Sequence, residues 1–425
     1  MVRSDSDPAD TIYALSSGRP PAAIGIIRIS GPRAGDALAR LAGALPEPRQ
    51  AVLRLLRDEN GAALDRALAL WFPGPGSATG EDLAELHVHG GRAVIEAVLA
   101  ALGRAGLRLA EPGEFTRRAL FNGRIDLAET EGLGDLLAAE TESQRREALA
   151  RANGALSRKL EGWTRALLDL AARIEAAIDY DDEMGTAADA GAGEAARALA
   201  AEIGRALAVP PAERLRDGLR VVIAGPPNAG KSSLFNALIG SEAAIVSAVA
   251  GTTRDAIERP IALKGVPIVL VDTAGLRESG GAIERIGVRR AIEQQALADI
   301  VIQLGPASGS GKEILISAKA DRVRPEAGRI ATSAVTGEGL TELVERIVVA
   351  ARTLLPGEGE VALDRRYREA LAKVRNDLDS AAASADMVLA AEHVRHARAA
   401  IDALTGRAGV EDMLDALFGR FCLGK

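Results

Sequence analysis

The segment GPPNAGKSS (225–233) carries the residues with the clearest chemistry. It matches G-x-x-x-x-G-K-[ST] and lies between an apolar stretch, RVVIA, and a helical pattern, SLFNALIG, which is the context that a phosphate-binding loop requires. Backbone N–H groups of such a loop and the N-terminus of the next helix can hold phosphates. Lys231 would bridge the β- and γ-phosphates, and Ser232 would ligate Mg²⁺. The segment therefore predicts a nucleoside triphosphate site rather than an ordinary glycine-rich turn.

Two further segments supply groups that a phosphate and Mg²⁺ site needs. In VLVDTAG (269–275), Asp272 ends an apolar strand, where its carboxylate can hold Mg²⁺ through water, and Gly275 can offer its N–H to the γ-phosphate. In AGTTRD (250–255), Thr253 can complete the Mg²⁺ shell. The order and spacing of the three segments predict a switch nucleoside triphosphatase.

The base-reading segment indicates guanine. A GTPase normally uses N-K-x-D, and here ISAKAD retains Lys319 and Asp321 but has Ala318 where asparagine belongs. Losing one such hydrogen bond costs roughly 0.5–1.5 kcal/mol, so we expect selectivity to rest on Asp321 with weaker affinity. TSAVTGEG (332–339) fits the loop that contacts the guanine carbonyl, which argues against an ATP-dependent kinase.

Two positions bear on the hydrolysis step. Leu276 stands where a Ras-type GTPase has a glutamine that positions water, and an apolar side chain cannot do this. Either hydrolysis is slow or another group orients the water. Asn228, with AIVSAVAGTT nearby, could hold a monovalent cation that supplies positive charge against the phosphates.

Composition restricts the class of protein that positions these residues. The chain has 425 residues and 48% hydrophobic content, enough for two or three domains that each bury a core. A single cysteine excludes an internal disulfide and indicates a reducing, cytoplasmic compartment. From the sequence we expect neither a secretory signal nor a membrane span. The net charge of −7 argues against nucleic-acid binding through bulk charge but allows a local basic patch.

Hydrophobic periodicity indicates an α+β region, a helical region and an α/β module. The predicted elements are strands at 22–30 and 83–89, an amphipathic helix whose stripe runs from Leu156 to Ile178, a loop at 186–193, parallel strands from Leu219 onward, a linker at 356–360 and a helix with a stripe from Tyr367 to Leu378. Strands that alternate with helices indicate a doubly wound parallel sheet. PASGSGK (306–312) is too short for a crossover helix, so we expect the module to be trimmed on one face or connected unusually.

Taken together, the motifs resemble those of the MnmE (TrmE) family of tRNA modification GTPases. The matching segments are GPPNAGKSSLFNAL, AGTTRD, DTAGLRE, IERIG, GIIRISGP, TGEDLAELHVHGG, GEFTRRALFNGRIDLAETEGL and the terminal FCLGK. The resemblance covers essentially the whole chain. It implies a multidomain fold with an α+β folate-binding and dimerisation domain (1–120), a discontinuous α-helical domain (121–215 and 353–425) and an inserted α/β P-loop, Ras-like GTPase domain (216–352).

The family's activity gives the expected function. With the FAD protein MnmG, the family forms a carboxymethylaminomethyl or aminomethyl group on the wobble uridine of certain tRNAs. The resemblance implies GTP, Mg²⁺, K⁺ and a tetrahydrofolate derivative (5-formyl or methylene form) as cofactors, with FAD only through the partner. It also implies a homodimer, assembled with MnmG as a heterotetramer, that acts on tRNA and not at a membrane.

The resemblance also assigns roles to single residues. Glu284 matches the general base, acting through water, and would replace the missing glutamine. Ser232 and Thr253 would bind Mg²⁺, and Asn228, Ser247, Val249 and Thr252 would surround K⁺. Folate would be bound by Arg28, Glu85, Arg124 and Lys425. The predicted GTP-binding residues are Asn228, Ala229, Gly230, Lys231, Ser232, Ser233, Ser247, Ala248, Val249, Ala250, Gly251, Thr252, Thr253, Asp272, Thr273, Ala274, Gly275, Lys319, Asp321, Ser333 and Ala334.

Other reactive side chains are interpreted as structural. Cys422 lies in the terminal tail, where we favour packing over a nucleophilic role. His393 and His396 share a helix face, but the sequence shows no third metal ligand, so we interpret them as a solvated face. The alternative to an RNA-modifying enzyme is a ribosome-assembly-type GTPase switch. The long N-terminal region and the charge-balanced tail favour the enzyme.

Overall fold

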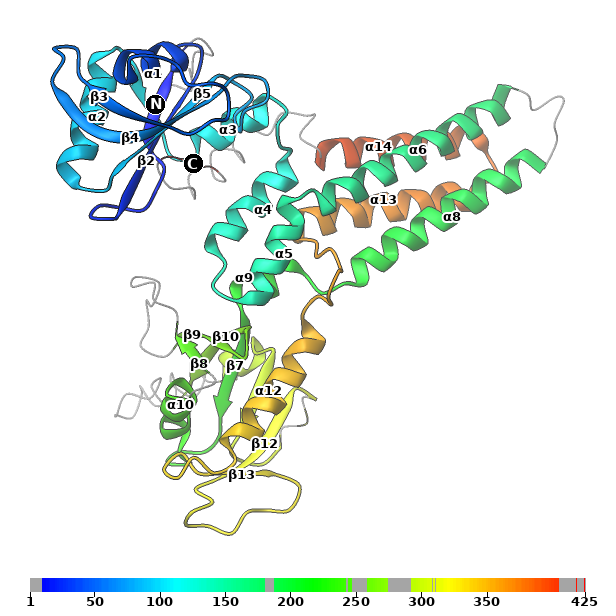
Figure 1. Ribbon diagram of the computed structural model, residues 1–425. Coiled ribbons are helices and arrows are strands. Elements are labelled where there is room, and N and C mark those ends of the chain that lie inside the picture. Colours follow the sequence, from blue (N-terminus) through cyan, green and yellow to red (C-terminus); the bar gives the residue numbers. More distant parts are fainter. Residues whose placement is uncertain are drawn as a thin grey trace, which may run out of the picture. The chain divides into compact units, whose positions relative to one another are not determined.

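The structure is a computed structural model, and most of the chain is described in it (Figure 1). The described residues are 10–179, 187–241, 244–246, 258–273, 292–307, 309, 311–404, 418 and 424. Two compact units divide the chain: the first comprises Met1–Gly134 with Thr405–Lys425, and the second comprises Asp135–Leu404. The domain boundaries inferred from the sequence are finer than this division and stay predictions.

Among the described residues, the first unit contains a six-stranded sheet in the order β3-β4-β5-β2-β1-β6. Its strands are β1 Ile12–Leu15, β2 Ile24–Ser30, β3 Val52–Arg57, β4 Ala63–Phe72, β5 Leu83–His89 and β6 Arg108–Leu109. Neighbours are antiparallel except β1 and β6. The strands predicted at 22–30 and 83–89 are confirmed by β2 and β5, whose register places Arg28 opposite Glu85.

Helices α1 (Ala34–Ala42) and α2 (Arg92–Arg104) pack against this sheet (Figure 1). Side chains alternate across a strand, so Ile27 and Ile29 of β2 face the same buried core as these helices. Helices α3 (Glu114–Phe121) and α4 (Leu127–Ala138) follow β6.

Four long helices of the second unit pack along one another (Figure 1). They are α6 Ala155–Asp179, α8 Ala187–Ala208, α13 Arg365–Ala383 and α14 Met387–Leu404. The predicted stripe of α6 is buried from Leu156 to Ile174, although Ile178 is exposed. The stripe of α13 is confirmed by the buried Tyr367, Leu371, Val374 and Leu378. No helix in the described ranges is both long and apolar enough to cross a membrane.

The loop predicted at 186–193 is wrong for residues 187–193, which begin α8. Alanine has the highest helix propensity, and the stretch AADAGAG is mostly alanine. Ala192 and Ala196 are buried, so packing also favours the helix over the predicted loop. Thr186 lies outside the described residues.

The α/β module of the second unit has a seven-stranded sheet in the described residues, in the order β13-β12-β11-β7-β10-β9-β8. Its strands are β7 Leu219–Ala224, β8 Ala244–Val246, β9 Glu258–Leu263, β10 Val266–Asp272, β11 Ile300–Gln303, β12 Glu313–Ala318 and β13 Ile330–Thr332. Strands β7, β10, β11, β12 and β13 are parallel to one another, which confirms the prediction of parallel strands from Leu219 onward. The antiparallel edge formed by β8 and β9 was not predicted. Helices α10 (Lys231–Ile239) and α12 (Leu340–Leu354) pack against the sheet.

The connection between β11 and β12 is unusually short. The two strands pair in parallel, yet only residues 304–312 join them, and none of the described residues among these is helical. The Val301 N–H donates to the Lys312 carbonyl at 2.9 Å, so the connection returns directly beside β11. The expectation of a module that is trimmed on one face or connected unusually is confirmed. Ile314 and Leu315 of β12 are only half-buried.

Candidate functional site

Residues 225–230 form a tight loop between the end of β7 and the start of α10. Three of them have left-handed backbone angles: Gly225 (φ 151°), Asn228 (φ 60°) and Gly230 (φ 100°). Glycine adopts this region without steric cost and asparagine tolerates it better than most residues. The sequence therefore allows the reversal of direction that turns successive N–H groups toward one anion.

Lys231 and the two serines after it occupy the first turn of α10. Lys231 is 5% exposed, and its Nζ donates to the carbonyls of Gly225 at 3.1 Å and Pro226 at 2.9 Å. These bonds hold the ammonium group over the loop. Ser232 and Ser233 are exposed, so the Ser232 hydroxyl is open to a metal or phosphate ligand.

Asp272 and Thr273 lie at the carboxyl edge of the sheet beside the loop. The parallel register pairs Asp272 with Ile223, one residue before β7 ends. Thr273 Oγ1 donates to the Ile223 carbonyl at 2.8 Å and is buried. A carboxylate at this edge can reach a cation held near the loop, as the sequence predicts for Mg²⁺.

Lys319, after β12, joins the predicted base site to the phosphate loop. Its backbone is left-handed (φ 61°), and its Nζ donates to the Asn228 carbonyl at 2.7 Å. Ala318 is the last residue of β12. The structure thus brings the ISAKAD and GPPNAGKSS segments together.

Asp321 is oriented by Ser333, from the loop after β13. Ser333 Oγ donates to Asp321 Oδ1 at 2.6 Å, and this bond lowers the pKa of Asp321, so the carboxylate is ionised near neutral pH. Ser333 is fully buried, and its Oγ accepts from the N–H groups of Val335 and Thr336 at 3.3 and 3.2 Å. Ala334, which follows Ser333 in the chain, is half-buried. An ionised carboxylate fixed in this way can accept two hydrogen bonds from a guanine edge.

Part of the predicted site lies outside the described residues. These residues are Ser247, Ala248, Val249, Ala250, Gly251, Thr252, Thr253, Ala274, Gly275, Glu284 and Lys425, and Cys422 lies outside as well.

In the first unit, Arg28 and Glu85 form the pair that the β2–β5 register allows. Arg28 Nε and Nη2 donate to Glu85 Oε1 at 3.0 and 2.8 Å, and the guanidinium lies 5.7 Å from the Phe115 ring centroid. His87 Nε2 lies 3.3 Å from Glu85 Oε2. Arg124 is exposed and makes no side-chain hydrogen bond or ion pair with any described residue.

The described residues near the end of the chain belong to this first unit and contact its earlier segments. Ser16 Oγ donates to the Gly424 carbonyl at 2.7 Å, and Phe418 is buried beside Gly113, at the start of α3. The residue before Lys425 is thus placed next to the end of β1.

Sequence reasoning missed a buried ionic cluster around α3. Arg118, 7% exposed, donates to Asp10 Oδ1 at 2.5 Å, Glu81 Oε2 at 3.1 Å and Glu114 Oε1 at 3.2 Å. Arg108 also donates to Glu114, which is 1% exposed. The i, i+4 spacing of Glu114 and Arg118 is visible in the sequence, but Asp10 and Glu81 are distant along the chain.

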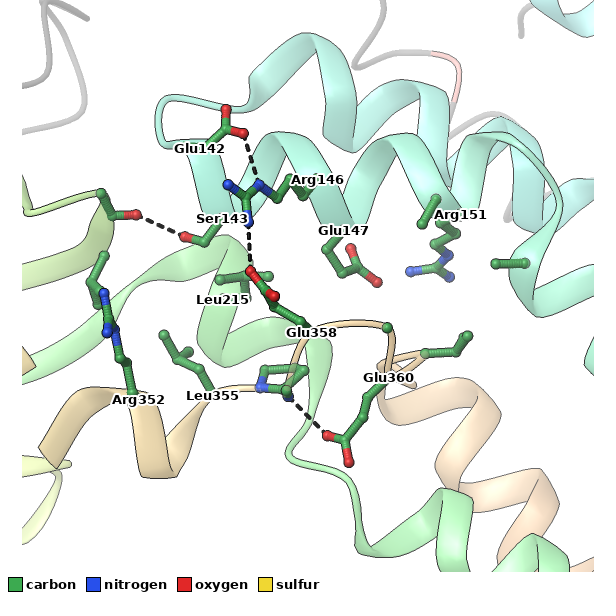
Figure 2. A pocket seen from close by; sticks show the side chains of 18 of the residues that line it. Glu142, Ser143, Arg146, Glu147, Arg151, Leu215, Arg352, Leu355, Glu358 and Glu360 are labelled. Atoms are coloured by element: carbon green, nitrogen blue, oxygen red, sulfur yellow. Dashed lines mark hydrogen bonds and ion pairs between the residues drawn. The ribbon is translucent and has the colours of Figure 1, made fainter. Parts of the chain in front are cut away.

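A cavity of about 750 Å³ lies where α5 (Glu142–Ala152) meets the β9–β10 turn and the segment after α12 (Figure 2). Ser143 Oγ donates to the Gly265 carbonyl at 2.8 Å, and Arg146 bridges Glu142 and Glu358. Burial raises the pKa of Glu147 in its wall. None of the lining residues belongs to the phosphate-binding loop, so this cavity is not the nucleotide site.

Gln144 connects α5 to the segment just before β7, the central strand of the seven-stranded sheet. Its Oε1 accepts from the Thr141 N–H at 2.9 Å, which completes a capping box. Its Nε2 donates to the carbonyls of Leu215 and Arg216, both at 3.1 Å, just before β7. The Gln144 amide thus caps α5 and also contacts the segment before β7, the strand that ends at the phosphate-binding loop.

Gln144→Ala should destabilise this junction by about 1 kcal/mol, because the helix loses half of its capping box. Arg145→Ala is the matched control, since Arg145 is exposed and its ion pair among the described residues is with the exposed Glu142, a contact worth about 0–1 kcal/mol. Urea unfolding followed by circular dichroism measures both. Equal midpoints for the two variants would show that the Gln144 contacts add nothing to stability.

Comparison with known proteins gives two family matches. Residues 11–124 match the model described as "GTP-binding protein TrmE N-terminus", and residues 127–422 match the "MnmE helical domain". A relative from Rhizorhabdus wittichii, named tRNA modification GTPase MnmE, is 58% identical over 98% of this chain and 97% of its own. One of the same name from Novosphingobium aromaticivorans is 54% identical over 98% of this chain and 100% of its own.

The chain belongs to the MnmE family of tRNA modification GTPases. The family resemblance inferred from the motifs is thereby confirmed. Among solved structures, the G domain of the T. maritima FeoB iron transporter is 30% identical and matches 31% of this chain and 98% of its own, with a TM-score of 0.23. A TM-score this low carries no weight for the fold.

Ala318→Asn should tighten guanine nucleotide binding. The substitution restores the amide of N-K-x-D at the end of β12, beside the phosphate loop, since Ala318 Cβ lies 4.0 Å from the position that a Cβ on Gly230 would take. One net hydrogen bond of about 0.5–1.5 kcal/mol corresponds to about 2- to 10-fold in affinity. Calorimetric titration with GDP measures the change. Unchanged or weaker binding would show that the base site of this chain does not use an asparagine at this position.

Proposed function

We propose that the chain is a potassium-activated GTP hydrolase that modifies the wobble uridine of certain tRNAs in the cytoplasm. In this proposal it acts as a homodimer with the flavoprotein MnmG, in a heterotetramer, and the uridine receives a carboxymethylaminomethyl or aminomethyl group built from a tetrahydrofolate one-carbon unit. FAD enters only through the partner. The observation that carries the proposal is family membership, together with a formed phosphate-binding loop whose Lys231 is already held in place.

The described residues suit GTP and its cations chemically. Lys231 would neutralise phosphate charge, and Ser232, in the first turn of α10, offers an exposed hydroxyl to Mg²⁺. Asp321 would accept from the guanine edge and Ser333 would keep it oriented. When bound, Mg²⁺ would supply positive charge to the β- and γ-phosphate oxygens.

Asn228 is the described residue that fits a potassium ligand. It is exposed, and its carbonyl is fixed by Lys319 while its side-chain amide stays available. Potassium would add positive charge at the phosphates, where an arginine finger acts in other GTPases. Ser247, Val249 and Thr252 would complete its shell, Thr253 would serve Mg²⁺, and Glu284 would act as general base through water. These five roles rest on the family resemblance alone.

Folate binding is assigned to Arg28, Glu85, Arg124 and Lys425. Arg124 supports this role because its exposed guanidinium is open to a folate carboxylate. The Arg28–Glu85 pair is fixed by neighbouring strands and offers both a donor and an acceptor for a pterin-like ring. The position of Gly424 beside the end of β1 supports a role for the tail in the same unit.

The proposal is tested by GTP hydrolysis in KCl and in NaCl, with excess ATP as competitor. We expect potassium to raise the rate roughly 10²-fold, with no inhibition by ATP. Asn228→Ala should lose the stimulation, whereas Asn236→Ala, an exposed asparagine on α10, should keep it. Equal slow rates in both salts would contradict the potassium mechanism and favour a ribosome-assembly-type switch. Inhibition by ATP would contradict guanine selectivity.

A further inference from the structure

Helices α13 and α14 bring together three side chains that can ligate a metal. His393 and His396 lie one turn apart on α14, and Asp377 lies on α13, which packs along α14 (Figure 1). One potential ligand atom from each residue lies within 4.8 Å of the other two. The sequence showed no third ligand for the histidine pair, so interpreting this pair as a solvated face missed Asp377, which is sixteen positions before His393.

The distance between His393 and Asp377 suits two ligands of one metal ion better than it suits a hydrogen bond. His393 Nδ1 lies 3.6 Å from Asp377 Oδ1, too far for a hydrogen bond. Two ligand atoms on a tetrahedral zinc ion at about 2.0–2.1 Å are separated by about 3.3 Å. His393 Nδ1 is also buried, and it has no hydrogen-bond partner among the described residues. A buried polar atom without a partner is rare in folded proteins, and an ion is one of its explanations.

His396 can complete the set with a small movement. Its side chain is 60% exposed, and a change between staggered rotamers of an exposed residue is easily accommodated. Since the three ligand atoms lie within 4.8 Å of one another, the longest separation would have to contract by at most about 1.5 Å to reach tetrahedral spacing. Glu392 Oε1 lies 3.0 Å from His396 Nε2, so this carboxylate is placed to orient the ring.

We propose that Asp377, His393 and His396 bind one divalent transition-metal ion of the zinc class, with water in the remaining position. Two imidazoles and one carboxylate suit Zn²⁺, Co²⁺ or Ni²⁺, whereas Mg²⁺ and Ca²⁺ prefer oxygen ligands. The site is thus chemically distinct from the Mg²⁺ position expected beside the phosphate loop. An ion there links α13 to α14, and it stabilises the helix pair because the unfolded chain lacks the site.

The test uses the untagged full-length chain, since histidines number only four in the sequence. Co²⁺ is titrated in the presence of Mg²⁺, and visible absorption typical of tetrahedral Co²⁺ is recorded, followed by displacement with Zn²⁺. We expect about one Co²⁺ per chain, with affinity at least about tenfold weaker in His393→Gln, His396→Gln and Asp377→Asn. His89→Gln is the matched control, because His89 is exposed and also paired to a carboxylate, Asp65.

Several outcomes would overturn the proposal. Wild-type protein that binds no Co²⁺ at millimolar concentration, or binding that survives His396→Gln unchanged, would each do so. Loss of binding in His89→Gln, or thiolate-to-cobalt absorption from Cys422, would place the ion elsewhere. Because His396 is exposed, His396→Gln should fold normally, and its circular dichroism spectrum verifies this.

Discussion

Lys231→Ala should lower kcat/KM for GTP by about 100- to 1000-fold, the cost of losing one electrostatic contact to developing charge in a closed site. Lys231 is buried at the start of α10, and two loop carbonyls hold its ammonium group close to where phosphates would bind. Alanine removes this charge but leaves the backbone N–H groups of the loop at 225–230 in place. Steady-state phosphate release measures the loss.

The control for this variant is Lys373→Ala, which removes an exposed lysine of α13. It should hydrolyse GTP at the wild-type rate. Thermal unfolding of both variants separates a local defect from misfolding, because Lys231→Ala should retain the cooperative transition of the wild type. A Lys231→Ala rate within threefold of wild type would refute the assignment of the phosphate-binding loop.

Arg118→Ala should destabilise the first unit by about 3 kcal/mol, because it removes the cation that pairs with Glu81 and one of the two arginines that pair with Asp10 and with the buried Glu114. Arg118 contacts Asp10, Glu81 and Glu114, and Glu114 is 1% exposed. The first unit can be observed separately, since it contains Trp71 and the other tryptophan of the chain is Trp163. Denaturant unfolding of a Trp163→Phe background, followed by Trp71 fluorescence, gives the difference.

Arg117→Ala provides a matched control on the same helix. Arg117 pairs with the exposed Glu111 at 3.4 Å, a contact worth about 0–1 kcal/mol. If the two variants unfolded at the same denaturant concentration, the buried cluster would not hold the first unit together.

The same cluster gives the pH dependence a definite sign. Burial alone would raise the pKa of Glu114, but hydrogen bonds from Arg108 and from the Glu111 N–H, with the charge of Arg118, lower it overall. A carboxyl whose folded pKa is lowered contributes stability above its unfolded pKa, about 4.3 for glutamate, and loses this contribution as pH falls through the folded value. The first unit should therefore lose stability below about pH 4, and Arg118→Ala should weaken this dependence.

The grouping of the described residues at the candidate nucleotide site could be predicted because its signals are local. The loop at 225–230 and Lys231 come directly after the short apolar strand β7, and Asp272 ends the apolar strand β10, so strand, turn and residue type coincide within a few positions. The contact of Lys319 with the Asn228 carbonyl spans 91 positions, yet parallel strands bring their carboxyl ends to one edge and make such meetings predictable.

Features that depend on distant partners could not be predicted. Asp10 and Arg118 are 108 positions apart, and nothing in either local pattern indicates the other. Asp377 faces His393 only because α13 and α14 pack side by side. The helical start of α8 was missed for another reason: the segment was predicted as a loop, but alanine propensity and the burial of Ala192 favour the helix.

The central claim, GTP-dependent tRNA modification, is tested most directly by nucleoside analysis of tRNA from cells that lack this chain. Mass spectrometry should show the modified wobble uridine absent in those cells, restored by the wild-type chain and by Lys373→Ala, and not restored by Lys231→Ala at equal protein level. Full modification in the absence of the chain, or restoration by Lys231→Ala, would contradict the account.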